Sequence, residues 1–133
     1  MAEIKIPKAR IAVVLGVDGK TKRKIEEKTN TKLKVNSKEG EVEISGEAVE
    51  TYQAEPILKA IGRGFNPEVA LTLIDEENCF ELIDIKHHSG NSKKKFSRMK
   101  SRLIGTRGKC RKTIELIAKV KLSIYGKTVG IIG

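Results

Sequence analysis

Two glycine pairs, each followed directly by a lysine, are the residues of this sequence whose spacing suits the binding of an anion. They lie in Gly16-Val17-Asp18-Gly19-Lys20 and Gly105-Thr106-Arg107-Gly108-Lys109. A glycine has no side chain to keep a ligand away from the backbone. The amides at the start of a following helix attract an anion, and a lysine there adds a positive charge. The spacing therefore predicts two clamps for a phosphate-bearing backbone.

The charge of the chain is concentrated around these glycine pairs. The 133 residues carry 27 Lys and Arg against 17 Asp and Glu, a net charge of +10. Lys93 to Lys112 holds ten basic residues and no acidic one, and Lys20 to Lys34 holds seven basic against two acidic. Between them, Asn36 to Ser92 has four basic and twelve acidic residues, a net of −8. Clustered Lys and Arg favour a nucleic acid over a solvated face or an anionic membrane, because neutralised phosphates release counterions.

An internal repeat places one glycine pair in each half of the chain. Seven residues recur 89 positions later, and three more recur after a two-residue shortening. The first set is Gly16, Gly19, Lys20, Ile25, Glu26, Lys32 and Leu33, matched by Gly105, Gly108, Lys109, Ile114, Glu115, Lys121 and Leu122; the second is Val42, Ile44 and Gly46, matched by Val129, Ile131 and Gly133. Duplication of one structural unit is the simplest explanation.

Each copy is predicted to contain the same elements in the same order. Copy one reads as a strand (3–6), two helices around the glycine pair (9–15 and 21–29), a hairpin (32–45) and a closing helix (48–61) ended by Gly62 and Gly64. Copy two reads as 79–85, 94–104 and 109–118, followed by a tighter hairpin that turns at 125–127. The order β-α-α-β-β-α predicts an α+β fold.

The connection between the copies and the end of copy two complete this organisation. A further helix is predicted at 68–75, and we expect it to pack the two units together because no Gly/Ser linker separates them. The domain boundaries are therefore placed at 1–65, 66–78 and 79–133. Copy two stops after its hairpin without a closing helix. We expect from this that the chain is a truncated piece of something longer.

These motifs resemble K-homology (KH) domains of type I. The runs IKIPKARIAVVLGVDGKTKRKIEEKTNTKLKV and RLIGTRGKCRKTIELIAKVKLSIYG both look like their strand-helix-GxxG-helix-strand core. The resemblance implies two tandem modules, each a three-stranded antiparallel sheet packed by helices, whose loop clamps about four nucleotides of a single strand. Copy two is most similar to the Dim/Pno-type proteins, in particular the archaeal ones. That likeness implies binding of small-subunit ribosomal RNA near its 3′ end, together with a Nob-type endonuclease and the alpha subunit of initiation factor two.

The two copies are not expected to bind RNA equally, because Asp18 in the first loop would oppose a phosphate. For the main site in copy two we predict Gly105, Thr106, Arg107, Gly108, Lys109, Arg98, Arg102, Arg111, Lys112 and Leu103. For a weaker site in copy one we predict Gly16, Gly19, Lys20, Lys22 and Arg23. Charge reversal at Arg107 and Lys109 should thus weaken binding more than reversal at Lys20 and Lys22.

An apolar groove beside each loop is the candidate for base contact. Its candidate residues are Leu103, Ile104, Ile114 and Leu122 in copy two, and Val14, Leu15, Ile25 and Leu33 in copy one. We expect most of these to be ordinary core residues. Leu103 and Val14, each on a short helix, are the better candidates for contact with a base.

Other signals for chemistry are weak. Gly19-Lys20-Thr21 could end a nucleotide-binding loop, but that motif needs a glycine where Val14 stands. His87 and His88 are adjacent and point to opposite faces of an extended chain, which disfavours one metal site. The acidic bend at 75–77 indicates a solvated loop, and Cys110 has no catalytic partner placed beside it. The sequence predicts no enzyme, no metal and no cofactor.

The leading hypothesis is a non-enzymatic RNA-binding adaptor that assists small-subunit ribosome maturation. The alternatives are a KH subunit of an RNA-degrading or processing complex such as an exosome, and a regulator that binds messenger RNA. No apolar run approaches the ~20 residues of a bilayer helix, and the N-terminus lacks the pattern of a secretory signal. Two isolated cysteines favour a reducing compartment. We therefore expect a cytoplasmic protein that does not bind membranes.

Overall fold

The computed structural model describes residues 2–85, 92–105 and 108–133, and it contains one unit twice. The first unit comprises β1 (Ala2–Lys5), α1 (Lys8–Leu15), η1 (Val17–Gly19), α2 (Lys20–Thr29), β2 (Lys32–Asn36), β3 (Glu41–Ser45) and α3 (Ala48–Gly62). The second comprises β4 (Phe80–Asp84), α6 (Lys93–Ile104), α7 (Lys109–Ala118), β5 (Lys121–Tyr125) and β6 (Thr128–Ile132). The predicted order of elements is confirmed, and no described helix follows β6.

Each unit contains a three-stranded antiparallel sheet with its last strand in the centre, in the orders β1-β3-β2 and β4-β6-β5. The second hairpin turns through Gly126 and Lys127 alone, with Gly126 at a φ of 56°. The first needs four residues, and the side chain of Asn36 accepts hydrogen bonds from two of their amides. Both turns agree with the sequence prediction.

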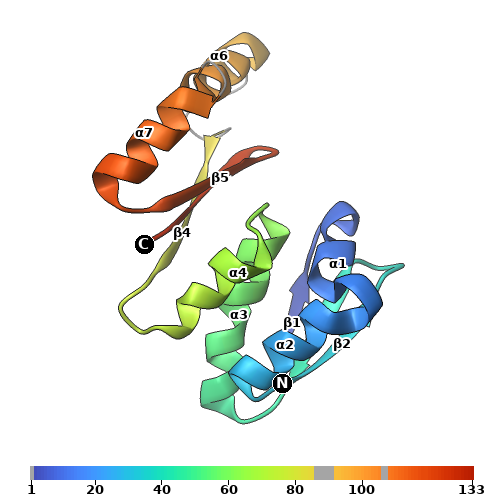
Figure 1. Cartoon of the computed structure of the whole chain (residues 1–133). Coiled ribbons are helices and arrows are strands. Elements are labelled where there is room, and N and C mark those ends of the chain that lie inside the picture. The colour runs from blue at the N-terminus through green and yellow to red at the C-terminus, as the bar shows by residue number, and fades with distance from the viewer. Residues whose placement is uncertain (1, 86–91, 106–107) are drawn as a thin grey trace.

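The elements stack in alternating layers of helix and sheet. Figure 1 shows α6 and α7 on one side of the second sheet, with α3 and α4 (Pro67–Ala70) on its other side and the first sheet farthest away. The core of the first unit lies between its own sheet and its helices, where Ile25, Ile44 and Ile57 are fully buried. The opposite face of the first sheet carries charged side chains such as Lys34, and it is open.

The connection between the units differs from the single helix predicted at 68–75. It consists of the one-turn helix α4, which Asn66 caps through its side chain, and a 3-10 turn, η2 (Leu71–Ile74). The hydroxyl of Thr72 donates to the carbonyl of Val69, and the amide of Asn78 donates to the carbonyl of Thr72. These side chains capture carbonyls that a longer helix would use, so the helical turn tightens and ends.

The two units pack against each other, as expected from the missing linker. Directly paired strand residues lie on one face of a sheet, so Phe80, Ser123, Gly130 and Ile132 share the face of the second sheet turned away from α6 and α7. We call this the inter-unit face. Phe65 packs edge-on against Phe80 at 6.2 Å between ring centroids, and Ile132 belongs to the same hydrophobic cluster as the core of the first unit.

Arginine side chains hold the turn of the second hairpin to the first unit. Arg63 donates from Nε to Thr128 Oγ1 and from a terminal nitrogen to the Tyr125 carbonyl, each at 2.9 Å. Its guanidinium lies 5.2 Å from the centroid of the Tyr125 ring, and that of Arg10 lies 5.9 Å away. The Ser123 hydroxyl donates to the Arg63 carbonyl. Most of these contacts come from Arg10 and Arg63, which precede the connecting helix predicted at 68–75.

We predict that Gly130→Val weakens the packing between the two units. A Cβ atom at Gly130 would lie 2.7 Å from the ring of Phe65, so the substitution should destabilise the fold by about 1–3 kcal/mol through overpacking. Chemical denaturation measures this loss. The control is Glu43→Val, the equivalent position on the open face of the first sheet, which should change stability by less than ~0.5 kcal/mol. Equal losses in the two variants would contradict the close approach of Phe65.

Candidate nucleic-acid interface

The two Gly-x-x-Gly loops have the same backbone geometry at their described glycines. Gly16 and Gly105 both have a φ of 71°, and Gly19 and Gly108 have φ values of 72° and 74°. In each loop the first glycine caps the preceding helix, with its amide donating to Ala12 O or to Ser101 O. The repeat seen in the sequence is therefore a repeat of one loop conformation.

The first and second glycines of each loop have different surroundings. A Cβ atom on Gly16 would overlap the side chain of Thr21, and one on Gly105 would lie 2.7 Å from the amide nitrogen of Cys110. A Cβ atom on Gly19 would meet nothing within 4 Å, and one on Gly108 would meet only the Arg111 guanidinium, at 4.0 Å. The first glycine is needed for the turn itself. The second leaves open space in which a ligand backbone can approach.

The helices that follow the loops begin without a side-chain cap. Gly19 and Gly108 are the N-cap residues of α2 and α7, and neither helix start receives a side-chain hydrogen bond. Uncapped amides and the helix dipole favour an anion at this point. Lys20 and Lys109, the first residues of the two helices, are both exposed. The geometry fits the predicted phosphate contact in each unit.

Arg111 links the second loop to the adjacent strand. Its Nε lies 3.7 Å from Glu115 Oε1, is buried, and has no hydrogen-bond partner among the described residues. The other oxygen of Glu115 accepts the amide of Leu122 at 3.0 Å. Glu115 thus braces the strand with one oxygen and faces Arg111 with the other, so that the guanidinium stays beside Gly108.

The first unit contains the same brace, since Glu26 accepts the amide of Leu33 at 2.9 Å. The role of these two glutamates is not among the sequence predictions. The available signal was their recurrence at one repeat position inside basic patches. An acidic residue that recurs inside a basic patch indicates a structural role more clearly than the basic residues around it.

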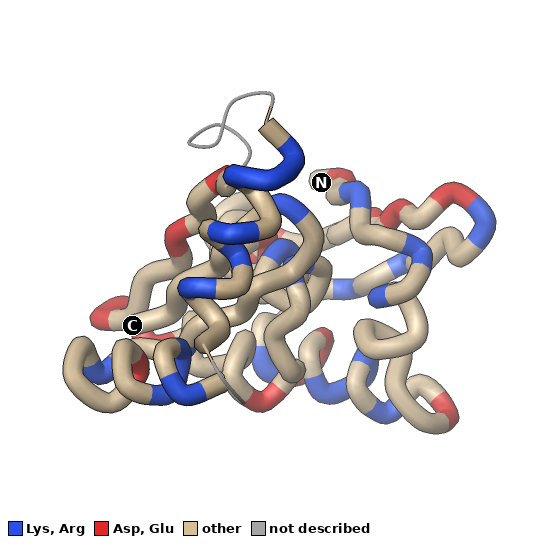
Figure 2. The backbone as a smooth tube through the Cα atoms, turned by 90° about the horizontal axis from the view of Figure 1, so that it is seen from above, with Lys and Arg blue, Asp and Glu red and all other residues tan. Residues whose placement is uncertain are grey.

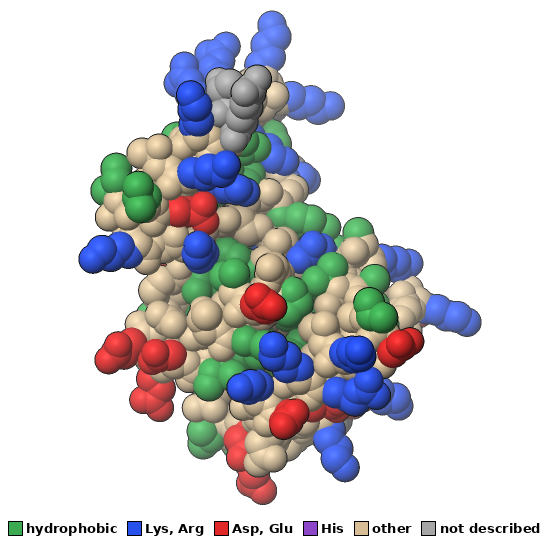
Figure 3. All heavy atoms as spheres, viewed as in Figure 1, with side chains coloured by type: hydrophobic (Ala, Val, Ile, Leu, Met, Phe, Trp, Pro, Cys, Tyr) green, Lys and Arg blue, Asp and Glu red, His purple; other side chains and the backbone are tan. Residues whose placement is uncertain are grey.

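The remaining predicted residues of the main site lie on α6, on α7 and in the loop. Arg98, Arg102, Lys109 and Lys112 are exposed, and Leu103 and Arg111 are half-buried. Thr106 and Arg107, like His87 and His88, lie outside the described residues. Figure 3 shows Lys and Arg side chains gathered at the end of the molecule formed by the second unit's helices. The structure brings the described candidates onto one end of the second unit.

The prediction that Val14 contacts a base is wrong. Val14 is fully buried in the cluster that includes Ala54 and Ile57 of α3, so it has no free surface. Leu103, its counterpart in the repeat, is half-buried, and no described helix of the second unit occupies the place of α3. Ile25 and Leu33 are core residues, as expected for most of this set.

The first loop differs from the second in its side chains. Asp18 has a φ of 54°, and its carbonyl accepts a hydrogen bond from the Arg23 guanidinium at 2.9 Å. One predicted cation of the weaker site is thus engaged by the loop itself. The carboxylate of Asp18 adds a negative charge next to Gly19. Both observations support a weaker first site.

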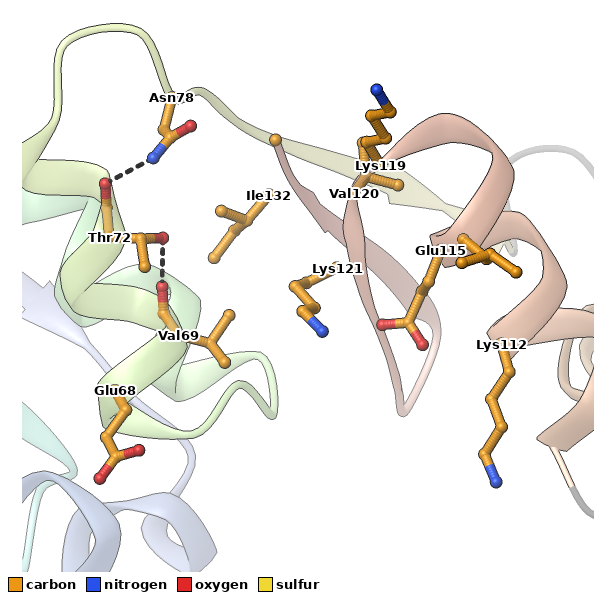
Figure 4. Close-up of a pocket in the computed structure, with 12 residues that line it drawn as sticks. Glu68, Val69, Thr72, Asn78, Lys112, Glu115, Lys119, Val120, Lys121 and Ile132 are labelled. Atoms are coloured by element: carbon orange, nitrogen blue, oxygen red, sulfur yellow. Dashed lines mark hydrogen bonds between the residues drawn. The ribbon is translucent and has the colours of Figure 1, made fainter.

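A groove of about 710 Å³ extends the basic surface away from the loop. Figure 4 shows it between α4 and the end of α7, with Lys121 and Glu115 directed into the space and Val69 and Ile132 along its floor. Lys112 and Lys119 line its outer side. The walls of the groove combine apolar side chains with lysines and with the carboxylates of Glu68 and Glu115.

In the part of the chain that the structure describes, no three His, Cys, Asp or Glu side chains are grouped so that they could hold a metal ion. No helix among the described residues is long and apolar enough to cross a membrane.

Comparison with known domains identifies the two units. The model of the eukaryotic type KH domain (KH-domain type I) matches residues 79–133, and the model of the KH domain matches residues 1–60. Two Gly-x-x-Gly loops, each on a helix pair over an antiparallel sheet, therefore define a tandem KH-domain chain.

The full chain also resembles archaeal proteins. It is 40% identical over 135 aligned positions to the KH domain-containing protein MJ0443 of Methanocaldococcus jannaschii, covering 98% of this chain and 59% of that protein. It matches the crystal structure of Dim2p from Pyrococcus horikoshii with a TM-score of 0.90 at 39% identity, covering 99% of this chain and 80% of the other. The chain belongs to the family of tandem KH-domain proteins that includes archaeal Dim2p. It spans about three-fifths of the curated relative.

A second structure of the Pyrococcus horikoshii protein is of its a/eIF2alpha-aDim2p-rRNA complex. The match has a TM-score of 0.90 at 39% identity and covers 99% of this chain and 75% of that chain. The likeness extends over both units, so their relative placement is shared as well as the fold of each.

We predict that Gly108→Asn weakens RNA binding without unfolding the chain. Asparagine tolerates the left-handed conformation, and its side chain would enter the open space beside the loop. Affinity for single-stranded RNA, measured by fluorescence anisotropy, should fall at least about tenfold. The control is Gly126→Asn, also at positive φ but in the hairpin turn. The loop assignment is wrong if both variants bind as well as the unsubstituted chain.

Proposed function

We propose that this chain is a non-catalytic adaptor that binds single-stranded small-subunit ribosomal RNA near its 3′ end and assists ribosome maturation in the cytoplasm. The observation that carries the proposal is the open second glycine of each loop, in a chain 39% identical to a protein crystallised with ribosomal RNA. The uncapped helix starts and the exposed lysines supply the complementary charge.

The proposed mode of binding follows from the second loop. The sugar-phosphate backbone would pass over Gly108, where no side chain blocks it. Its phosphates would meet the free amides of α7 together with Lys109 and Arg111. The bases would then point away from the loop toward half-buried Leu103. An apolar contact of this kind holds a base without a stacking aromatic side chain.

The proposed partners are the alpha subunit of initiation factor two and a Nob-type endonuclease. The first is supported by the composition of the Pyrococcus horikoshii complex. The second is supported by the family resemblance alone. In both cases the role of this chain would be to hold the RNA strand while the partner acts or binds. The RNA would then be the molecule that this chain and its partners bind in common.

We predict that the second unit carries most of the affinity. The double variant Lys109→Glu/Lys112→Glu should weaken RNA binding roughly 10- to 100-fold and lower the salt dependence by about two ions, because two phosphate contacts are lost. The matched variant is Lys20→Glu/Arg23→Glu, the equivalent repeat positions, and it should cost less than about fivefold. Titrations at several salt concentrations measure both. Equal losses would show that the loops contribute equally.

The RNA target can be identified by crosslinking in a native lysate. Reads that accumulate at the 3′ region of small-subunit ribosomal RNA are expected. Reads scattered over messenger RNA would instead indicate a regulator. Binding that survives a chelator but weakens with salt would separate an adaptor from a metal-dependent nuclease.

A further inference from the structure

Helix α6 begins one turn earlier than its counterpart in the first unit. It has 12 residues, whereas α1 has 8, and both end at equivalent positions of the repeat, Ile104 and Leu15. The additional turn contains Lys93, Lys94 and Lys95, which we call the lysine turn. All three side chains are exposed. The first unit has no equivalent turn at the start of α1.

The lysine turn is unfavourable for the isolated helix. Cations at a helix N-terminus oppose the dipole, and α6 has no acidic residue in its first turn. The hydroxyl of Ser92 accepts the amide of Lys95 at 3.1 Å, so the helix is capped without a compensating charge. Lys94 and Arg98 are also four residues apart, a like-charge spacing that destabilises a helix. Among the described residues the ion pair Arg111–Glu115 lies on α7, and no described carboxylate pairs with a cation of α6.

The cations of α6 form a stripe that leads to the second loop. Lys94, Arg98 and Arg102 follow one another at intervals of four residues and so share one helix face. This face lies opposite half-buried Phe96, Met99 and Leu103. At 1.5 Å per residue the stripe is about 12 Å long, and it ends three residues before Gly105. Figure 2 shows the blue run at the start of α6.

We propose that the lysine turn and this stripe bind the phosphates of the RNA segment that leaves the loop site, independently of its sequence. The inference rests on the proposed function and extends the RNA footprint beyond the loop. The stripe ends three residues before Gly105 and offers no large apolar side chain. A protein-docking surface would present aromatic or aliphatic anchors. The chemistry that fits is therefore a flexible polyanionic strand.

The test compares RNA lengths. The triple variant Lys93→Gln/Lys94→Gln/Lys95→Gln and the unsubstituted chain are titrated with oligouridylates of 5 and 15 nucleotides. Three lost phosphate contacts should lower the salt slope for the 15-mer by about 2 and its affinity by roughly 10- to 100-fold. The 5-mer, which fills only the loop site, should lose less than about threefold. The longer RNA also offers more binding registers, but this factor is the same for every variant.

A matched control removes the same charge elsewhere. The triple variant Lys5→Gln/Lys38→Gln/Lys59→Gln changes three exposed lysines of the first unit outside its basic stretch, and it should lose less than about threefold with either RNA. The proposal is overturned if the two triple variants lose equally, or if the lysine-turn variant loses as much with the 5-mer as with the 15-mer. It is also overturned if that variant binds the 15-mer normally, which would leave the proposed function intact. Failure of the unsubstituted chain to bind either RNA would defeat the proposed function as well.

Discussion

The inter-unit face of the second sheet packs on the end of α3 and on the segment that follows it, and the arrangement of the chain depends on this contact. The two sheets have the same topology but different environments. The first sheet buries one face and exposes charged residues such as Lys34 and Glu3 on the other. The second sheet has Ser123 and Gly130 where the first has Lys34 and Glu43, and its Gly130 and Ile132 are buried. A duplicated unit has therefore become dependent on its neighbour through a few substitutions on one sheet face.

The same contact supports the RNA-facing side of the second unit. Arg63 bonds to both ends of the β5–β6 turn, and Lys100 of α6 donates to the carbonyl of Gly126 in that turn. The helix that precedes the second loop is thus connected to the first unit through the hairpin. The helices are less well covered, since Leu116 and Ile117 of α7 are 80% and 76% exposed. Among the described residues, the second loop is therefore supported through the sheet face that contacts the first unit and not by a closing helix.

The sequence predicts the order of elements well because local signals agree with the repeat. Glycines, turn residues and alternating apolar residues occur at matching positions in both copies, and the predicted bounds of the strands and long helices lie close to the observed ones. The errors concern side-chain contacts. Burial of Val14 under α3 depends on packing between distant segments, and the role of Arg63 depends on partners more than sixty residues away. The early end of α4 depends on the hydrogen bond from Asn78 to Thr72, six residues apart, and the role of Glu115 on the amide of Leu122, seven residues apart. The repeat and the hydrophobic periodicity specify none of these pairings.

The two loops share φ values to within 2° at their described glycines, so backbone geometry cannot make one unit the stronger RNA site. Any inequality must come from side chains around a common backbone. In the first unit Arg23 bonds to the loop, and Arg10 of the preceding helix donates to the carbonyls of Ile61 and Phe65 in the same unit. In the second unit the preceding helix is longer, and apart from Lys100, which bonds to Gly126, its cations are exposed. The first unit has thus committed Arg10 and Arg23 to contacts within the chain, whereas the second keeps most cations of its preceding helix available for a polyanion. One repeated fold can in this way supply support in one copy and binding in the other.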